Sequence, residues 1–125
     1  MVVCCVKTLS ALDTGNPALI MTDKFLIKVR SVVEANISNS FFSVEMLAEK
    51  VNLSRAQLFR KLKALLNTSP RELINDIRLQ RAAQLIRAKT DNVSRIGYAV
   101  GFNEQSYFSK RFRKKYGVSP SEYAE

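Results

Sequence analysis

The stretch that decides the fold is residues 43–74, SVEMLAEKVNLSRAQLFRKLKALLNTSPRELI, because its pattern returns at residues 92–124 as NVSRIGYAVGFNEQSYFSKRFRKKYGVSPSEYA. The two segments match at apolar and turn positions, with one extra residue at the turn of the later copy. The matched positions are Val44, Leu47, Ala48, Val51, Leu53, Leu58, Leu62, Leu66 and Ser69-Pro70 in the first copy, and Val93, Ile96, Gly97, Val100, Phe102, Phe108, Phe112, Tyr116 and Ser119-Pro120 in the second. Self-similarity of this kind predicts one supersecondary unit present twice.

The first copy has the pattern of a helix, a tight turn and a second helix. Ser43 is a suitable N-cap, and apolar residues follow it with the three-and-four spacing of one helical face. Asn52 tolerates the left-handed conformation that ends a helix. Ser54 and Gln57 then fit a capping box, which starts a second helix with an inward row of leucines. We therefore predict a helix-turn-helix unit over residues 43–66.

The second copy predicts the same unit over residues 92–116. Gly101 stands where the first copy has Asn52, and Asn103 is the expected cap of the second helix. Small residues, Ala48 and Gly97, lie midway along the first helix of each copy, where two helices packed at a steep angle approach closely. A bulky residue at either position would separate the helix pair.

A long helix is predicted between the two copies. Residues 69–72, Ser-Pro-Arg-Glu, combine an N-cap, a proline at the first helical position and a capping-box glutamate. The helix should run over about residues 70–88, a length of roughly 27 Å. Its broad apolar face predicts packing against both units as a spacer. Residues 119–122, Ser-Pro-Ser-Glu, repeat the start signal and predict a short terminal helix.

Upstream of the first copy, an amphipathic helix is expected to cover that unit. Its apolar residues are Phe25, Leu26, Val29, Val32, Val33 and Ile37. Residues 1–22 show no sustained period, and the stretch Thr14-Gly15-Asn16-Pro17 is typical of a break, so we expect a disordered leader. Two alternatives stay open: the remnant of a preceding domain or linker, or an extension from a misplaced start, since Met21 stands just before the folded pattern. The expected architecture is all-α, with about seven helices and a folded domain over residues 23–125.

Composition narrows the function. The chain has 125 residues, with 20 Lys and Arg against 11 Asp and Glu, and its net charge of +9 favours a polyanionic partner. The excess is concentrated in the two repeated segments. No histidine is present, so the commonest general base and metal ligand are missing. Cys4 and Cys5 are adjacent and lie outside the expected fold, which favours free thiols. No secretory signal or membrane-spanning stretch is evident, and we expect a cytoplasmic protein without cofactor, metal or membrane partner.

Together, the paired turns and the ending GFNEQSYFSKRFRKKYGVSPSEY resemble the DNA-binding domain of the AraC/XylS family. The resemblance covers about residues 23–124. The segments FSVEMLAEKVNLSRAQLFRKLKALLNTSPRELI and RLQRAAQLI are similar to the version at the C terminus of hybrid two-component regulators, where a sensor or receiver domain precedes it. The resemblance implies sequence-specific binding to promoter DNA by a bacterial transcription regulator, with two recognition helices in successive major grooves. RNA polymerase is a further partner that it suggests.

Carried over by position, the resemblance implies base-reading residues in the second helix of each unit. They are Ala56, Phe59 and Arg60 in the first unit, and Gln105, Ser106, Ser109 and Lys110 in the second. Arg60 is the leading candidate, because arginine can make two hydrogen bonds to guanine, whereas Ala56 and Phe59 offer only apolar contact, for example to a thymine methyl. Gln suits adenine, Lys suits guanine and Ser is permissive. The alternative to base reading is that Phe59 belongs to the core and that Lys110 is an ordinary solvent-exposed lysine.

Contacts with the DNA backbone are expected from basic side chains and from the amino ends of the first helices. The candidates are Arg55, Lys61, Lys63, Arg111 and Arg113, with Ser43 and Asn92 at the helix starts. Such contacts set affinity and position but carry no direct sequence information.

Three other function classes compete with this interpretation. A nonspecific nucleic-acid binder would use the basic helices only to neutralise phosphate and would show a steep salt dependence. A basic protein-interaction domain would bind an acidic partner instead. An enzyme is the least favoured, because no base is paired with a Ser or Lys nucleophile and no phosphate-binding GxxxxGK[ST] loop occurs.

Overall fold

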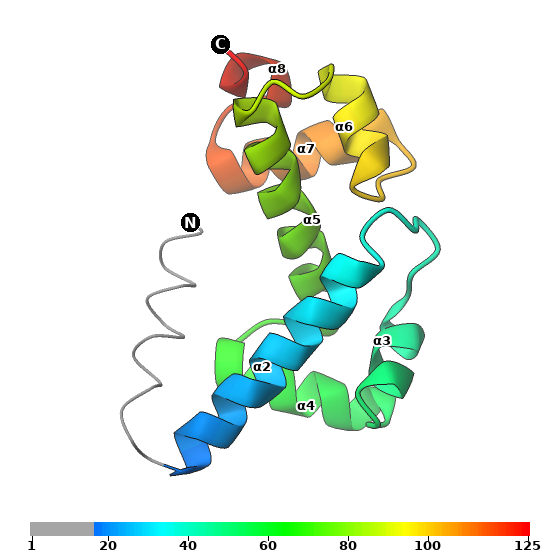
Figure 1. Cartoon of the computed structure of the whole chain (residues 1–125), viewed down its shortest axis with the longest axis vertical. Helices are drawn as coiled ribbons and strands as arrows, with labels where there is room; N and C mark the ends of the chain where they lie inside the picture. Colours follow the sequence, from blue (N-terminus) through cyan, green and yellow to red (C-terminus); the bar gives the residue numbers. More distant parts are fainter. Residues whose placement is uncertain (1–16) are drawn as a thin grey trace. The chain divides into compact units, whose positions relative to one another are not determined.

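The computed structural model describes the backbone of residues 17–125 and the side chains of residues 24–125. In that part of the chain, seven helices follow one another without any strand, which confirms the predicted all-α fold (Figure 1). They are α2 (Pro17–Ala35), α3 (Val44–Lys50), α4 (Arg55–Leu66), α5 (Pro70–Arg87), α6 (Val93–Ala99), α7 (Gln105–Tyr116) and α8 (Pro120–Tyr123). Of the described residues, unit 1 comprises those up to Ala35 with Ser43–Leu73, and unit 2 comprises Asn36–Phe42 with Ile74–Glu125.

The predicted turn of unit 1 is present between α3 and α4. The Ser43 hydroxyl accepts a hydrogen bond from the Met46 backbone N–H at 3.3 Å and so caps α3. Asn52 has a φ of 59°, the left-handed conformation that its residue type predicted. Ser54 and Gln57 form the expected capping box at the start of α4, with reciprocal bonds of 3.1 and 2.9 Å. These local bonds satisfy donors that a helix start leaves unpaired.

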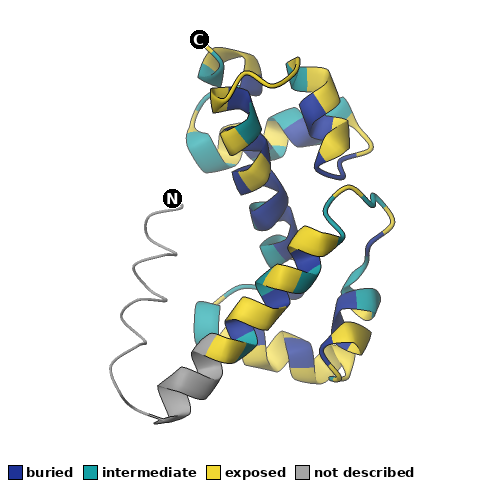
Figure 2. Ribbon diagram, in the orientation of Figure 1, coloured by how far each residue is buried: buried dark blue, intermediate teal, exposed yellow. Residues whose placement is uncertain are grey.

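The core of unit 1 is built from the inward faces of α2, α3 and α4. Leu47, Leu58 and Leu62 are completely buried. On α2, Val29 and Val33 are buried while Lys28 and Glu34 stay exposed, so the helix is buried along one side and solvated along the other (Figure 2). Since α2 packs against α3, the predicted cover of the first unit is confirmed. Ile37 was wrongly included in it, because α2 ends at Ala35 and Ile37 packs against the core of unit 2.

The turn of unit 2 differs from the prediction at the start of α7. Asn92 caps α6 as expected for that residue type, its side chain accepting from the Arg95 N–H at 2.9 Å. The predicted cap Asn103 was wrong: Glu104 occupies the N-cap position, without a side-chain hydrogen bond, and α7 begins at Gln105. The extra residue in this turn is the cause, because it leaves Asn103 one position outside the helix end.

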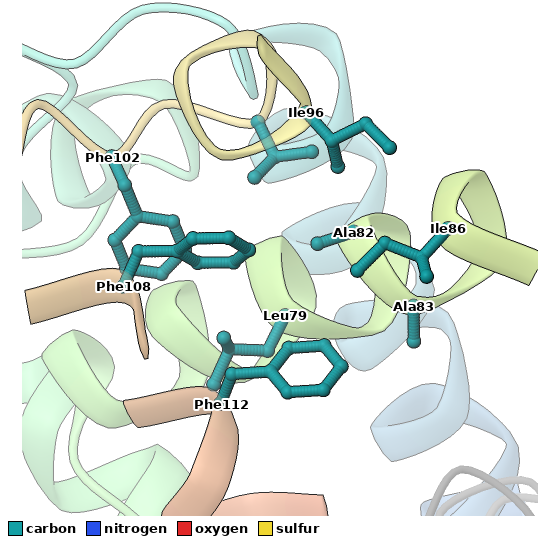
Figure 3. Packing of buried hydrophobic residues seen from close by; sticks show 9 residues of the cluster. Leu79, Ala82, Ala83, Ile86, Ile96, Phe102, Phe108 and Phe112 are labelled. Atoms are coloured by element: carbon teal, nitrogen blue, oxygen red, sulfur yellow. The ribbon is translucent and has the colours of Figure 1, made fainter. Parts of the chain in front are cut away.

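Aromatic rings dominate the core of unit 2. The Phe108 ring lies 5.1 Å from the Phe102 ring and 5.9 Å from the Phe112 ring, measured between centroids. Figure 3 shows these rings beside Leu79 and Ala82 of α5. All five residues are buried, and edge or tilted contacts between rings add to the stabilisation that burial provides. The apolar face predicted for the long helix therefore packs on α6 and α7 within unit 2.

Gly97 lies where α6 and α7 approach each other. A Cβ added at this residue would lie 2.8 Å from Cδ2 of Phe108 and 3.0 Å from Nε2 of Gln105. The expected close approach is confirmed in unit 2. Ala48, at the matching position of unit 1, is also buried, and its side chain is a single methyl group.

Arg78 anchors the segment Asn36–Phe42 to α5 within unit 2. The side chain is buried, and its Nη2 donates a hydrogen bond to the Asn39 carbonyl at 3.0 Å. Burial lowers the pKa of Arg78 because the low-dielectric interior disfavours its charge. Gly101 packs beside it with a φ of 99°, and an added Cβ would clash with the Ile37 carbonyl oxygen. Both the conformation and the space therefore require glycine there.

The two proline-led helix starts follow their predictions. α5 runs over Pro70–Arg87, one residue shorter than expected, and the Ser69 hydroxyl accepts from the Glu72 N–H at 3.2 Å. Ser119 and Glu122 form a full capping box at α8.

At the amino end, α2 begins at Pro17, six residues before the expected boundary. Proline suits a first helical position because it has no N–H to satisfy, so the break predicted at Pro17 is a helix start. The remainder of the predicted leader, residues 1–16, lies outside the described residues. No helix in the described part of the chain is both long and apolar enough to span a bilayer.

Candidate nucleic-acid interface

The three predicted base readers of α4 share one solvent-facing side of the helix. Ala56, Phe59 and Arg60 are three and four residues apart and are all exposed. Phe59 retains 47% of its surface, whereas its neighbour Leu58 retains none. The structural alternative of a core phenylalanine is therefore excluded at this position.

The matching face of α7 is polar and only partly free. Ser106 and Lys110 are exposed, while Ser109 and Gln105 are half-buried. The Gln105 Nε2 donates a hydrogen bond to the Ser94 carbonyl at 3.1 Å, which ties α7 to α6. An amide reads adenine with both of its polar atoms, and Nε2 carries a second proton that the bond to Ser94 leaves for this purpose.

Among the predicted backbone-contacting residues of unit 1, Arg55 already has a partner. Its guanidinium lies 2.7 Å from a carboxylate oxygen of Glu45, and both side chains are largely exposed. The pKa of Glu45 lies below its ordinary value because the carboxylate accepts a backbone hydrogen bond and faces Arg55. An exposed pair of this kind contributes little stability, so Arg55 can exchange Glu45 for a phosphate at small cost.

The two lysines of α4 occupy different surroundings. Lys61 is exposed and lies over the Phe25 ring of α2, with Nζ 4.2 Å from the ring centroid. Lys63 is exposed farther along the helix. A cation–π contact at an exposed site is weak, about 0.5–1 kcal/mol, so it holds Lys61 only loosely.

In unit 2, the predicted backbone contacts are unequal in accessibility. Arg113 is exposed, whereas Arg111 is half-buried. Asn92 and Ser43 use their side chains to cap α6 and α3, so any phosphate contact at these helix starts would come from backbone N–H groups.

An open hollow of ≈ 640 Å³ lies on unit 1 beside the predicted readers of α4. It is lined by Val44, Arg55, Ala56, Phe59, Arg60, Ser69, Pro70 and Arg71. The last three come from the start of α5, and sequence reasoning assigned them only to helix capping. The sequence contains no sign that they line this hollow, because nothing local shows that the start of α5 lies beside the exposed face of α4.

The repeated units and their exposed second helices match a known family. A family model described as a helix-turn-helix domain matches residues 47–125, more than half of the chain. An AraC-type DNA-binding-domain protein of Chromobacterium violaceum is 32% identical, with a TM-score of 0.76 over 84% of this chain and 93% of that structure. This chain belongs to the AraC/XylS family. The family comprises DNA-binding domains of transcription regulators and is not an enzyme class.

Two further relatives of this AraC/XylS domain come from signalling proteins. The C-terminal domain of AraT, a response regulator of Geobacillus stearothermophilus, is 33% identical with a TM-score of 0.72, over 80% of this chain and 83% of that structure. Histidine kinase P4 of Formosa agariphila is 44% identical over 101 residues, which are 81% of this chain and 7% of that protein. The chain spans well under half the length of the curated relatives that it matches.

Proposed function

We propose that this domain binds double-stranded DNA sequence-specifically and is the output domain of a bacterial transcription regulator. The observation that carries the proposal is the repeated exposed face: α4 and α7 present side chains to solvent at matching positions of two helix-turn-helix units. Recognition helices of such units lie in the major groove, and two of them suit successive grooves about 34 Å apart. α5, the connecting helix of 18 residues, is about 27 Å long and is the proposed spacer.

Base reading is proposed for the exposed residues of these two faces. Arg60 of α4 and Lys110 of α7 can each bond guanine in the major groove. Ser106 and Ser109 are permissive donors and acceptors, and Gln105 can read adenine with its amide oxygen and the Nε2 proton that does not bond Ser94. Ala56 and Phe59 add apolar contact.

Phosphate contacts are proposed for the basic side chains around these faces. Lys63 and Arg113 are exposed, Lys61 and Arg55 are exposed but weakly held by Phe25 and Glu45, and Arg111 would contribute from a half-buried position. The backbone amides near Ser43 and Asn92 complete the set. Phosphate contacts of this kind make affinity fall with salt.

The signal is proposed to come from outside this domain. Similarity to a histidine kinase and to a response regulator supports a sensor or receiver domain as the input. RNA polymerase is the expected protein partner at the promoter. A bacterial regulator of this kind is expected to act in the cytoplasm.

The decisive experiment is unbiased binding-site selection from random duplex DNA with the full chain. We expect convergence on a bipartite site whose halves lie about one helical turn apart, roughly 10 base pairs. Arg60→Ala and Lys110→Ala should each erase preference in a different half. Recovery of random sequences, with steep salt dependence, would favour nonspecific binding instead, and absence of DNA binding by a folded protein would favour a protein partner.

A further inference from the structure

The hollow on unit 1 has a mostly apolar wall set in a basic surface. Val44, Ala56, Phe59 and Pro70 supply apolar surface from α3, α4 and α5. Phe59 is 47% exposed, whereas Leu58 and Leu62 of the same helix are completely buried in the core. A large exposed aromatic beside a hollow is a feature typical of a binding surface.

The charges around the hollow point to a polyanion. Arg55, Arg60 and Arg71 line it, and all three are exposed. Glu45 is the acidic residue that pairs with one of them, so the lining itself carries only positive charge. Arg71, the second residue of α5, is thereby placed beside the base-reading face as an additional phosphate contact.

Of the four bases, thymine is the one whose major-groove edge suits contact with an apolar wall. Adenine, guanine and cytosine present hydrogen-bonding groups there, whereas thymine alone adds a methyl group. A polar base edge pressed against Phe59 and Ala56 would lose water without gaining a partner, which is unfavourable. A thymine methyl would instead gain from burial.

Unit 2 keeps only half of this wall at the matching positions of its sequence: Val93 and Pro120 match Val44 and Pro70, but the two α4 positions become polar. Ser106 replaces Ala56, Ser109 replaces Phe59 and Ser121 replaces Arg71. Hydroxyl groups at these places favour hydrogen bonds to base edges. The two units therefore differ in the kind of contact that they can offer to DNA.

Building on the proposed DNA binding, we propose that the hollow beside Phe59 is a thymine-methyl reader. Unit 1 then selects thymine by apolar contact at one or two base pairs, with Phe59 as the specificity-determining residue and Arg71 on an adjacent phosphate. Unit 2 selects its bases by hydrogen bonding.

The test is parallel site selection with the full chain from two random duplex libraries, one containing thymine and one containing uracil in its place. Uracil lacks only the 5-methyl group. The selected duplex is then titrated with each thymine replaced in turn. We expect one or two positions whose replacement weakens binding about fourfold each, the effect of one buried methyl. Preference at those positions should vanish in the uracil library, while preference elsewhere persists.

Two variants assign the effect to the hollow. Phe59→Ser introduces the residue of unit 2 and should bind thymine and uracil duplexes alike. Ile27→Ser is the matched control, because Ile27 is a comparably exposed apolar residue of unit 1, 55% exposed, on α2 and outside the hollow. It should keep the thymine preference, and circular dichroism should show both variants folded.

The outcomes separate the two proposals. Convergence in both libraries, with uracil and thymine bound equally, would overturn the methyl reader and leave sequence-specific binding intact. A thymine effect that survives Phe59→Ser would also overturn it. If neither library converges on a sequence, the thymine library included, the proposed function itself is refuted.

Discussion

α4 and α7 hold the same place in two copies of one unit, yet their exposed faces differ in chemistry. α4 presents Ala56 and Phe59 beside Arg60, whereas α7 presents Ser106 beside Lys110. The buried faces of these helices keep the unit together in both copies. The comparison teaches that the fold constrains the inner face and leaves the outer face free to change what is bound.

The buried faces differ as well, but in a correlated way. Unit 1 combines Leu58 with Ala48, and unit 2 combines Phe108 with Gly97. The larger ring reaches the first helix so closely that a Cβ at residue 97 would lie 2.8 Å from it. A larger side chain on the second helix is thus accompanied by a smaller residue on the first helix. This is expected because protein interiors are close-packed.

The largest expected effect is from Ala83→Pro, which tests whether the two units fold independently. Ala83 is buried in the core of unit 2, and proline would remove a helix hydrogen bond and clash with the preceding turn, costing about 3 kcal/mol or more. We expect amides of α6 and α7 to lose protection from hydrogen exchange before those of α3 and α4.

Ala83→Gly is the control, since it keeps the N–H and costs only about 1 kcal/mol. Equal loss of protection in both units of the proline variant would show that they unfold as one.

Gly97→Ala tests whether the size of the residue on the first helix must match the size of the buried residue on the second helix. Overpacking against Phe108 should destabilise the domain by about 1–3 kcal/mol in urea titration, although alanine favours helices. The reverse change, Ala48→Gly, should cost only about 1 kcal/mol, from helix propensity. Combining Gly97→Ala with Phe108→Leu reproduces the residue pair of unit 1 and should relieve the overpacking. If the stability losses of the two single variants simply add in the double variant, the two positions are not coupled.

Lys110→Ala and Arg60→Ala test whether both outer faces read bases. Each should cost about 1–3 kcal/mol on the selected site and less on random DNA, because a specific base contact is lost. Fluorescence anisotropy on both duplexes measures the difference. Equal weakening on both duplexes would assign these side chains to phosphate alone.

The smallest effect is expected from Lys63→Ala, which should weaken all sequences alike. Loss of one phosphate contact should lower the magnitude of the salt slope by about one. Titrations at several salt concentrations check this, and a sequence-dependent loss would instead make Lys63 a base reader.

The sequence alone determined the repeated helix-turn-helix units, because their signals are local. Ser43, Ser54 and Ser119 cap helices through bonds that span three residues, and apolar spacing sets each inner face. Asn52 and Gly101 follow helix ends because their residue types tolerate the positive φ that such ends require. Such features need no knowledge of the rest of the chain.

Tertiary structure decided what depends on residues far apart in the sequence. It showed that Gln105 is tied to Ser94, that Arg78 anchors Asn39, and that α7 starts after an uncapped turn. Above all, it brought Pro70 and Arg71 beside Phe59 to form a hollow. Periodicity assigns a residue to a face, but only packing determines which other segment that face meets.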